Sequence, residues 1–379
     1  MLQSLHIQNY RNLKNFRMKS LDQVNLITGR NNTGKSILLE AIRIYASKGN
    51  LLDLEQIVEN HGEFLRQRDR TKNTESDDLK TLSSLFTNRT IGFNAENSIL
   101  IGELAEDIFG NSTMPDGSVI IQFVRYIDET QKDASSNLLR RRVLIGENNI
   151  EADRDFKIGF KVTVKGANSE YLYPLDNFNF RRFPYGENPI SDSYQFIKTG
   201  NIDREINGKL FDDIALTDKE KYVIEALKII EPETERVAFI EKDARGRRDA
   251  IIKLKGSKDV YPLKSMGDGI NRILTIILAL VNCENGFLMI DEFENGLHYS
   301  VQEQLWKIIF KLSKELDIQV FATTHSEDCI KGFQRTINDP QNSVSGKLIR
   351  MDSIDGIIKQ TQFSPDELKI ADEQDIEVR

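Results

Sequence analysis

A glycine-rich stretch, "GRNNTGKS" at residues 29–36, has the residue types and spacing of a loop that binds phosphate groups. Its pattern is G-x-x-x-x-G-K-[ST], in which backbone N–H groups surround a phosphate, the lysine neutralises charge and the hydroxyl ligates Mg²⁺. Lys35 is therefore predicted to contact the β- and γ-phosphates of ATP, and Ser36 to ligate Mg²⁺. The loop residues predicted to bind the nucleotide are Gly29, Asn31, Asn32, Thr33, Gly34, Lys35 and Ser36.

Two adjacent acids, Asp291 and Glu292, directly follow the apolar run "FLMI". Such a run predicts a buried central strand, and Asp291 at its carboxyl end can hold Mg²⁺ through a water molecule. Glu292 is then placed to orient or deprotonate an attacking water. The alternative is a strand that simply stops at a charged turn. Combined with the phosphate loop, the acid pair favours ATP hydrolysis with Glu292 as the base.

A histidine, His325, ends a further apolar run, "VFATTHS". A histidine at the end of a buried strand can reach the γ-phosphate and report its presence. The alternative is a satisfied polar residue at a strand end. His325 is the functional candidate among the four histidines, and His298, in the turn after the acids, is the second.

A second phosphate-facing element, "SMGDG" at residues 265–269, opens the apolar, helix-patterned run "INRILTIILAL". Backbone N–H groups at a helix N-terminus bind anions. A second cradle is redundant if each chain works alone. It is useful if it faces the γ-phosphate held by another copy, so the sequence predicts two chains that clamp two ATP molecules.

The remaining pattern predicts a P-loop α/β fold with a mixed, mostly parallel sheet. A strand at 24–29 precedes the loop, and apolar residues recur at helical spacing over 34–46. Later, apolar strands alternate with helices. We expect an ATPase head formed by residues 1–60 and 261–379, which includes an acidic tail. Residues 61–260 are expected to form an inserted α+β lobe with part of the head sheet.

Composition predicts a cytoplasmic protein. The formal net charge is −8, the two cysteines lack metal-ligand spacing, and the N-terminus lacks the apolar core of a signal peptide. The longest apolar run, at 273–281, is too short to cross a bilayer, so no membrane partner is expected.

The motifs taken in order resemble the ABC-type ATPase heads of the SMC, RecF and OLD (overcoming lysogenization defect) families. The matching stretches are "LHIQNYRNLKNF", "GRNNTGKS", "SMGDG", "FLMIDE", "ENGLH" and "TTHS". The "DEFENGLH" stretch is similar to the form common in OLD-like ATPases.

This resemblance implies that Ser265 and Gly267 contact nucleotide in trans and that residues 294–298 lie in a dimer-facing loop. The "SMGDG" stretch corresponds to the signature of these families and departs from their pattern at Met266 and Asp268, so slow turnover is expected. The glutamine that links γ-phosphate to the lobe is not evident, and Gln122 is a guess. OLD nucleases carry a Toprim nuclease domain, whereas "MDSID" is a poor substitute for its acids. No nuclease site is expected in this chain.

Three functions remain open at this stage. The favoured one is an ATP-driven sensor or scaffold of the stand-alone OLD-like kind, which resembles components of bacterial anti-phage or toxin-like systems and works with a separate nuclease or toxin effector. The second is a RecF-like DNA-binding ATPase in repair, suggested by the basic clusters "LRRRV", "FRRF" and "KDARGRRD". A phosphotransferase is a distant third, because it leaves "SMGDG" unexplained.

Overall fold

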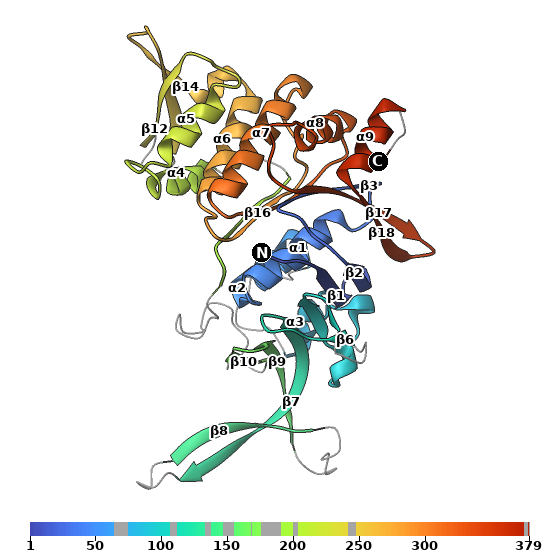
Figure 1. The fold of residues 1–379 in the computed structure, drawn as a ribbon. Coiled ribbons are helices and arrows are strands. Elements are labelled where there is room, and N and C mark those ends of the chain that lie inside the picture. Colours follow the sequence, from blue (N-terminus) through green and yellow to red (C-terminus); the bar gives the residue numbers. More distant parts are fainter. Residues whose placement is uncertain are drawn as a thin grey trace. The chain divides into compact units, whose positions relative to one another are not determined.

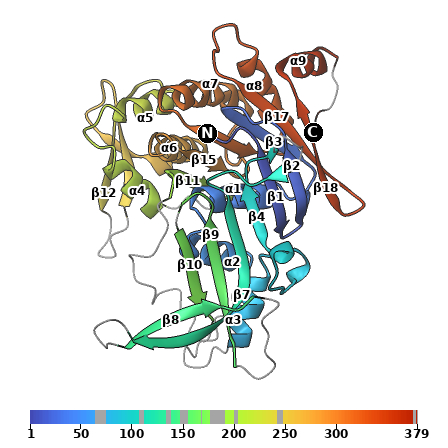
Figure 2. The same ribbon diagram turned by 60° about the horizontal axis from the view of Figure 1, so that its bottom comes forward.

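A computed structural model describes most of the 379-residue chain, which forms two compact units (Figures 1 and 2). The described residues are 1–63, 75–106, 112–132, 138–146, 155–167, 169–175, 191–199, 204–241, 248–374 and 378. Unit 1 comprises Met1–Gln3, Ser20–Leu39 and Asp192–Arg379, and unit 2 comprises Ser4–Lys19 and Glu40–Ser191.

These units divide the chain at other positions than the expected boundaries at 60 and 260. Residues 192–260 are compact with the C-terminal part of the chain, because their first strand pairs with the acid-bearing strand of unit 1. Residues 4–19 and 40–60 belong to unit 2 instead. Compactness does not by itself define an ATPase head, so the assignment of 1–60 and 261–379 to a head stays a prediction.

Unit 1 is built on a six-stranded sheet. In spatial order its strands are β11 (Tyr194–Ile197), β15 (Phe287–Ile290), β16 (Gln319–Thr323), β3 (Val24–Gly29), β17 (Gly346–Ile354) and β18 (Ile357–Phe363). Neighbours are parallel from β11 to β17, and β18 is antiparallel to β17. Every residue of β3, β15 and β16 is buried, as expected for central strands of a parallel sheet. The predicted mixed, mostly parallel sheet is confirmed.

A row of helices lies along this sheet (Figure 1). The helices are α5 (Glu220–Leu227), α6 (Asp268–Val281), α7 (Tyr299–Glu315), α8 (Glu327–Ile337) and α9 (Pro365–Glu373). Helix α4 (Arg204–Asp212) packs against α6 and against a small antiparallel sheet. That sheet contains β12 (Thr234–Glu241), β13 (Arg248–Leu254) and β14 (Val260–Pro262), and the 3₁₀ turn Leu263–Met266 follows it.

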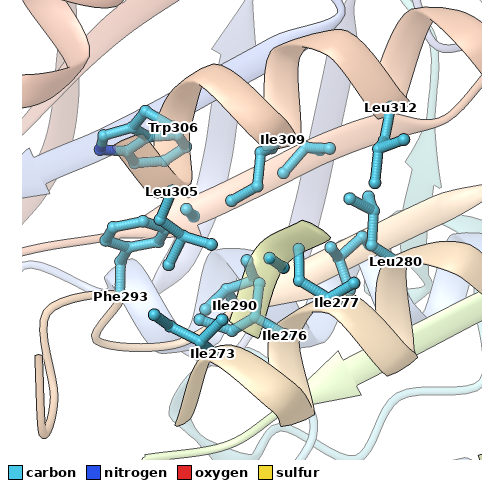
Figure 3. Close-up of a cluster of buried hydrophobic side chains, with 14 of the residues drawn as sticks. Ile273, Ile276, Ile277, Leu280, Ile290, Phe293, Leu305, Trp306, Ile309 and Leu312 are labelled. Carbon is cyan, nitrogen blue, oxygen red and sulfur yellow. The ribbon is translucent and has the colours of Figure 1, made fainter. Parts of the chain in front are cut away.

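The core of unit 1 lies between α6, α7 and β15 (Figure 3). Helix α6 is buried at every position from Arg272 to Val281, which fits its nearly continuous apolar sequence. The labelled side chains that pack together are Ile273, Ile276, Ile277 and Leu280 of α6, Ile290 and Phe293 around the end of β15, and Leu305, Trp306, Ile309 and Leu312 of α7. Burial of each of these side chains contributes roughly 1.5–3 kcal/mol to the stability of the folded chain, so the end of β15, next to the acids, is part of a stable core.

Unit 2 contains an antiparallel seven-stranded sheet. Six strands form a path in the order β10 (Ser169–Pro174), β9 (Lys157–Val164), β7 (Val119–Lys132), β4 (Ile99–Gly102), β1 (Leu5–Tyr10) and β2 (Leu13–Met18), and β8 (Leu138–Leu144) pairs with β7. The other elements include α2 (Leu51–Asn60), α3 (Glu75–Ser83) and a short pair, β5 (Ala105–Glu106) and β6 (Ser112–Thr113). Its core includes Phe123, which stacks on Phe86 and meets Phe160 edge to face.

Candidate nucleotide site

The phosphate loop connects β3 to α1 (Lys35–Ala46), the strand–loop–helix context that the sequence predicts. Three of its residues have positive φ: Gly29 at 140°, Asn32 at 62° and Gly34 at 86°. Glycine and asparagine adopt such conformations at little cost. A Cβ on Gly29 would come within 2.2 Å of the Met351 carbonyl oxygen of β17, so only glycine fits there. The Thr33 hydroxyl donates to the Arg30 carbonyl at 2.9 Å and braces the loop.

Lys35, the first residue of α1, is buried inside this loop, with 6% of the residue exposed. Its ammonium donates to the backbone carbonyls of Gly29 (2.7 Å) and Arg30 (2.8 Å). No carboxylate of the described residues forms an ion pair with it. A buried cation that forms no direct ion pair within the described residues, at a helix N-terminus whose first N–H groups lack intrahelical partners, fits a phosphate group.

The charge of Lys35 should make nucleotide binding depend on pH. Burial lowers the pKa of this ammonium from 10.5 to about 8, although Asp291, Glu294 and Glu292 oppose the shift. Attraction of phosphate needs the charged form, so we expect ATP affinity to fall above pH 8, by up to about tenfold per pH unit. Bound phosphate favours the charged form and can only move the midpoint upward. Titration of a fluorescent ATP analogue from neutral pH to about pH 10 measures this dependence.

The stability of the free protein should respond in the opposite sense. Between pH 8 and 10.5 the unfolded chain holds this proton more firmly than the folded one, so the Lys35 contribution to unfolding free energy rises with pH. Weaker ATP binding at high pH therefore cannot be ascribed to this lysine unfolding the site. An affinity that stays constant up to pH 10 would contradict a role for the Lys35 charge.

Asp291, immediately after β15, accepts hydrogen bonds from three hydroxyl groups of this site. Its carboxylate accepts hydrogen bonds from Ser36 at 3.0 and 3.1 Å, from Thr323 at 2.7 Å and from Thr199 at 2.9 Å. Ser36 lies in the first turn of α1, whereas Thr323 and Thr199 lie at the carboxyl ends of β16 and β11. A carboxylate and hydroxyls that converge in this way are hard oxygen ligands of the kind that Mg²⁺ prefers.

Glu292 has a left-handed backbone, with φ of 47°, which is uncommon for a residue other than glycine. Its N–H donates to the Thr323 hydroxyl at 2.9 Å, and the next N–H, of Phe293, donates to the Thr323 carbonyl at 2.9 Å. The half-buried Glu292 carboxylate makes no hydrogen bond within the described part of the chain. Such a carboxylate is available to a water molecule.

His325 lies two residues beyond β16 and is half-buried. The Glu294 carboxylate fixes its backbone, because it accepts from the His325 N–H and from the Thr324 hydroxyl, both at 2.8 Å. Strand β16 lies between β15 and β3, so the carboxyl ends that carry His325, Asp291 and the phosphate loop share one edge of the sheet. His298 instead caps α7, since its Nδ1 accepts from the Ser300 N–H.

The signature residues lie at the start of α6. Ser265 is exposed and donates to the Pro262 carbonyl at 2.7 Å. Gly267 is the N-cap of α6 with φ of 98°, and no atom lies within 4 Å of the place where its Cβ would stand. Met266, a departure from the family pattern, packs partly buried against the core of unit 1. Their contact with a second copy stays a prediction.

Two residues of this site are not predicted from the sequence. Thr199 follows β11, a strand that was not predicted, and contacts Asp291. Arg272 is a buried arginine in α6 whose guanidinium donates to the Asp291 and Glu292 carbonyls at 2.9 Å. A single charge in the apolar run "INRILTIILAL" was the available signal. Gln122, the guessed γ-phosphate residue, lies inside β7 of unit 2, paired with Lys161, and not at a strand end.

The basic clusters considered for DNA are only partly described. "FRRF" lies outside the described residues, as does "KDARGRRD" except for its last two residues. Of these, Arg248 is paired with Asp212. In "LRRRV", Arg142 lies 3.9 Å from the Asp128 carboxylate. These two arginines are therefore engaged with acids of the same chain, and DNA binding stays an untested prediction.

Among the described helices, none combines the length and the apolar character that a membrane span requires.

Comparison with known proteins identifies a family that matches most of the chain and a relative that matches nearly all of it. A family model for the AAA ATPase domain matches residues 1–138 and 187–330. A protein of Helicobacter pylori named "ATP/GTP phosphatase" is 23% identical over 369 residues, which cover 92% of this chain and 91% of that protein.

Two solved structures are similar at low identity. The SMC head domain from Thermotoga maritima is 12% identical, with a TM-score of 0.44, over 96% of this chain and 99% of that one. A structure of the SmcHead bound to the C-winged helix domain of ScpA is 14% identical, with a TM-score of 0.47, over 96% of this chain and 97% of that one.

The family match includes the phosphate loop, the start of α6, the acid pair and His325. The fold is that of a P-loop ATPase with a mixed α/β architecture. The chain belongs to the AAA ATPase domain family.

Proposed function

We propose that this chain hydrolyses ATP in the presence of Mg²⁺ and acts as a switch that dimerises around the nucleotide. The observation that carries the proposal is the contact between Ser36 and Asp291, at 3.0 Å, which joins the phosphate loop to the acid pair across 255 residues of sequence. The family supports nucleotide hydrolysis. The name of the Helicobacter pylori relative, "ATP/GTP phosphatase", supports phosphate release and makes GTP the competing substrate.

The chain's own residues divide the work of hydrolysis. Lys35 and the loop N–H groups hold the β- and γ-phosphates, and Lys35 balances their charge. Ser36 and Asp291 would hold Mg²⁺, which supplies charge neutralisation on the phosphate oxygens when bound. Glu292, whose carboxylate is free of hydrogen bonds in the described residues, accepts the proton of the attacking water. His325 contacts the γ-phosphate side and distinguishes ATP from ADP.

Dimerisation around ATP would give the "SMGDG" stretch at the start of α6 a function. Ser265 is exposed, and the space around Gly267 is open on its Cβ side, so the start of α6 is accessible to a ligand that its own chain does not hold. In a pair of copies, Ser265 and Gly267 of each would meet the γ-phosphate bound by the other. Hydrolysis then removes the shared ligand and releases the pair. Turnover is proposed to be slow, because Met266 and Asp268 depart from the family signature.

The biological role is proposed from the OLD-like motif "DEFENGLH". The chain would serve as the ATP-driven sensor or scaffold of a bacterial anti-phage or toxin-like system, with the damage done by a separate nuclease or toxin. Residues 139–186 and 331–379 lie outside the family match, and we propose that they carry the partner-specific surfaces. This role rests on analogy of sequence motifs.

Metal removal tests the hydrolytic part directly. Phosphate release from ATP and from GTP is measured with Mg²⁺ and with excess chelator, because the Ser36–Asp291 pair predicts a metal-dependent reaction. We expect release with Mg²⁺ and loss to background with the chelator. Release that persists without divalent metal, or that occurs equally from a simple phosphomonoester, would contradict the proposed function.

A further inference from the structure

The guanidinium of Arg272 is buried deep in unit 1, with 3% of the residue exposed. Burial lowers its pKa, and the nearby carboxylates of Asp291, Glu294 and Glu292 oppose that shift. Burying an arginine is costly unless its donors are satisfied. Its Nε has no hydrogen-bond partner in the described part of the chain. The cost of burying this side chain is therefore offset by the hydrogen bonds of its two terminal nitrogens.

Those nitrogens hold the backbone at two neighbouring strand ends. Nη2 donates to the carbonyls of Asp291 and Glu292, both at 2.9 Å, directly after β15. Nη1 donates at 3.5 Å to the carbonyl of Lys198, directly after β11. Lys198 precedes Thr199, whose hydroxyl contacts Asp291. One side chain therefore fixes the backbone on both sides of the site that holds the acids.

The same side chain belongs to the helix that begins at the signature. Gly267 is the N-cap of α6, and Arg272 lies in its second turn. Near the start of α6, a Cβ on Gly269 would stand 3.2 Å from the Gly296 carbonyl, so this end of the helix closely approaches the loop that follows the acids. A displacement of the signature end of α6 must therefore move either this loop or Arg272 itself.

We propose that Arg272 is a positioning residue that sets the Glu292 backbone and couples it to the signature end of α6. The inference rests on the proposed function in that Glu292 is taken as the base. Glu292 has a left-handed backbone, and its N–H and carbonyl are held by Thr323 and Arg272, respectively. Loss of the Arg272 bonds leaves the Glu292 backbone held by the Thr323 hydroxyl and by the Asn295 N–H, which donates to the Glu292 carbonyl at 3.1 Å within the same turn. These bonds do not tie the segment to α6. Binding of a second copy at Gly267 would act on the base through this arginine.

The test compares Arg272→Met, Arg272→Lys and a control on the same helix, Thr275→Val. Thr275 is buried one turn further on and bonds to Asn207 at 2.8 Å, so its loss also weakens the packing of α6 but touches no residue of the site. The readouts are ATP affinity, kcat, melting temperature and Trp306 fluorescence. Trp306, the only tryptophan of the chain, stacks on Phe293 at 4.0 Å and reports on the segment next to Glu292 without any turnover.

We expect Arg272→Met to lower kcat on the order of tenfold to 100-fold, as displacement of a catalytic group does, while ATP affinity changes far less. Arg272→Lys should retain more activity than Arg272→Met, because an ammonium keeps the charge. It should retain less than the wild type, because it cannot reach all three carbonyls. Both should change Trp306 emission in the absence of nucleotide. Thr275→Val should lower the melting temperature with kcat and emission unchanged.

The outcomes separate this inference from the proposed function. If Arg272→Met folds and keeps the wild-type kcat and the wild-type Trp306 emission, Arg272 does not position the segment around Glu292. If the methionine variant does not fold, the same result with Arg272→Lys leads to the same conclusion. A loss of kcat equal to that of Thr275→Val at equal loss of stability would also overturn it. A wild-type protein that hydrolyses no nucleotide, with emission still changed in the variants, overturns the proposed function and leaves the positioning intact.

Discussion

Lys35→Ala is expected to remove nucleotide binding without unfolding the protein. The ammonium is buried among the loop carbonyls, and its charge has no carboxylate partner in the described residues. Truncating a buried partner of a charged ligand costs about 3 kcal/mol, which corresponds to an affinity loss on the order of 100-fold. Isothermal titration with ATP and Mg²⁺ measures the loss. The melting temperature should change little, because burial already disfavours the charged lysine in the folded state.

A surface lysine provides the matched control for this change. Lys307 lies on α7 and pairs with Glu303 at 3.0 Å and with Asp339 at 3.7 Å, so Lys307→Ala removes the same charge from the same unit. Exposed ion pairs of this kind contribute little. Lys307→Ala should bind ATP as the unchanged protein does. Normal ATP binding by Lys35→Ala would show that the nucleotide binds elsewhere.

Glu292→Gln is expected to bind ATP, stop turnover and accumulate as a dimer. The amide has the size of the carboxylate but cannot accept the proton of water, and loss of a general base costs about 10²- to 10⁴-fold in rate. The left-handed backbone at this position should be unaffected, because the two side chains have the same branching. The mass of the variant in solution, with and without ATP and Mg²⁺, reports the assembly, and phosphate release reports the chemistry.

The two readouts have separate consequences. Turnover at the wild-type rate would show that Glu292 is not the base. A mass that stays the same with nucleotide, while turnover is blocked, would contradict the ATP-dependent dimer and leave the hydrolytic site standing. Glu303→Gln, the same chemical change at a half-buried position of α7 outside the site, should alter neither readout.

The parts of the fold that were predictable are those in which local pattern and burial agree. Strand β3, the loop and α1 have continuous apolar or helix-periodic sequence bounded by glycine, and they form as predicted. The same holds for α6 and α7, and for β15 and β16, whose residues are all buried. The parallel arrangement followed from their alternation along the chain.

Strands β11 and β18 could not be identified from the sequence for a physical reason. Strand β11, "YQFI", is four residues long, only partly buried and flanked by polar runs, so it lacks a continuous apolar signal. It becomes a strand because β15 offers it an unpaired parallel edge. Thr199 was missed with it, since only this pairing brings the threonine to Asp291. Strand β18, "IIKQTQF", lies at the edge of the sheet, contains a run of four polar residues and has no buried residue, so it also lacks an apolar signal.

The strand order of unit 1 also constrains when the protein can acquire its site during synthesis. Strand β3 is made long before its partners in the described sheet, β16 and β17, whose residues are Gln319–Thr323 and Gly346–Ile354. Its buried, apolar sequence therefore stays unpaired until β16 and β17 have left the ribosome. Pairing over such separations is slow, and unpaired apolar strands are prone to aggregation. A nascent chain cannot hold nucleotide in the assembled site until β16 and β17 have been made, so its dependence on chaperones should persist until that point.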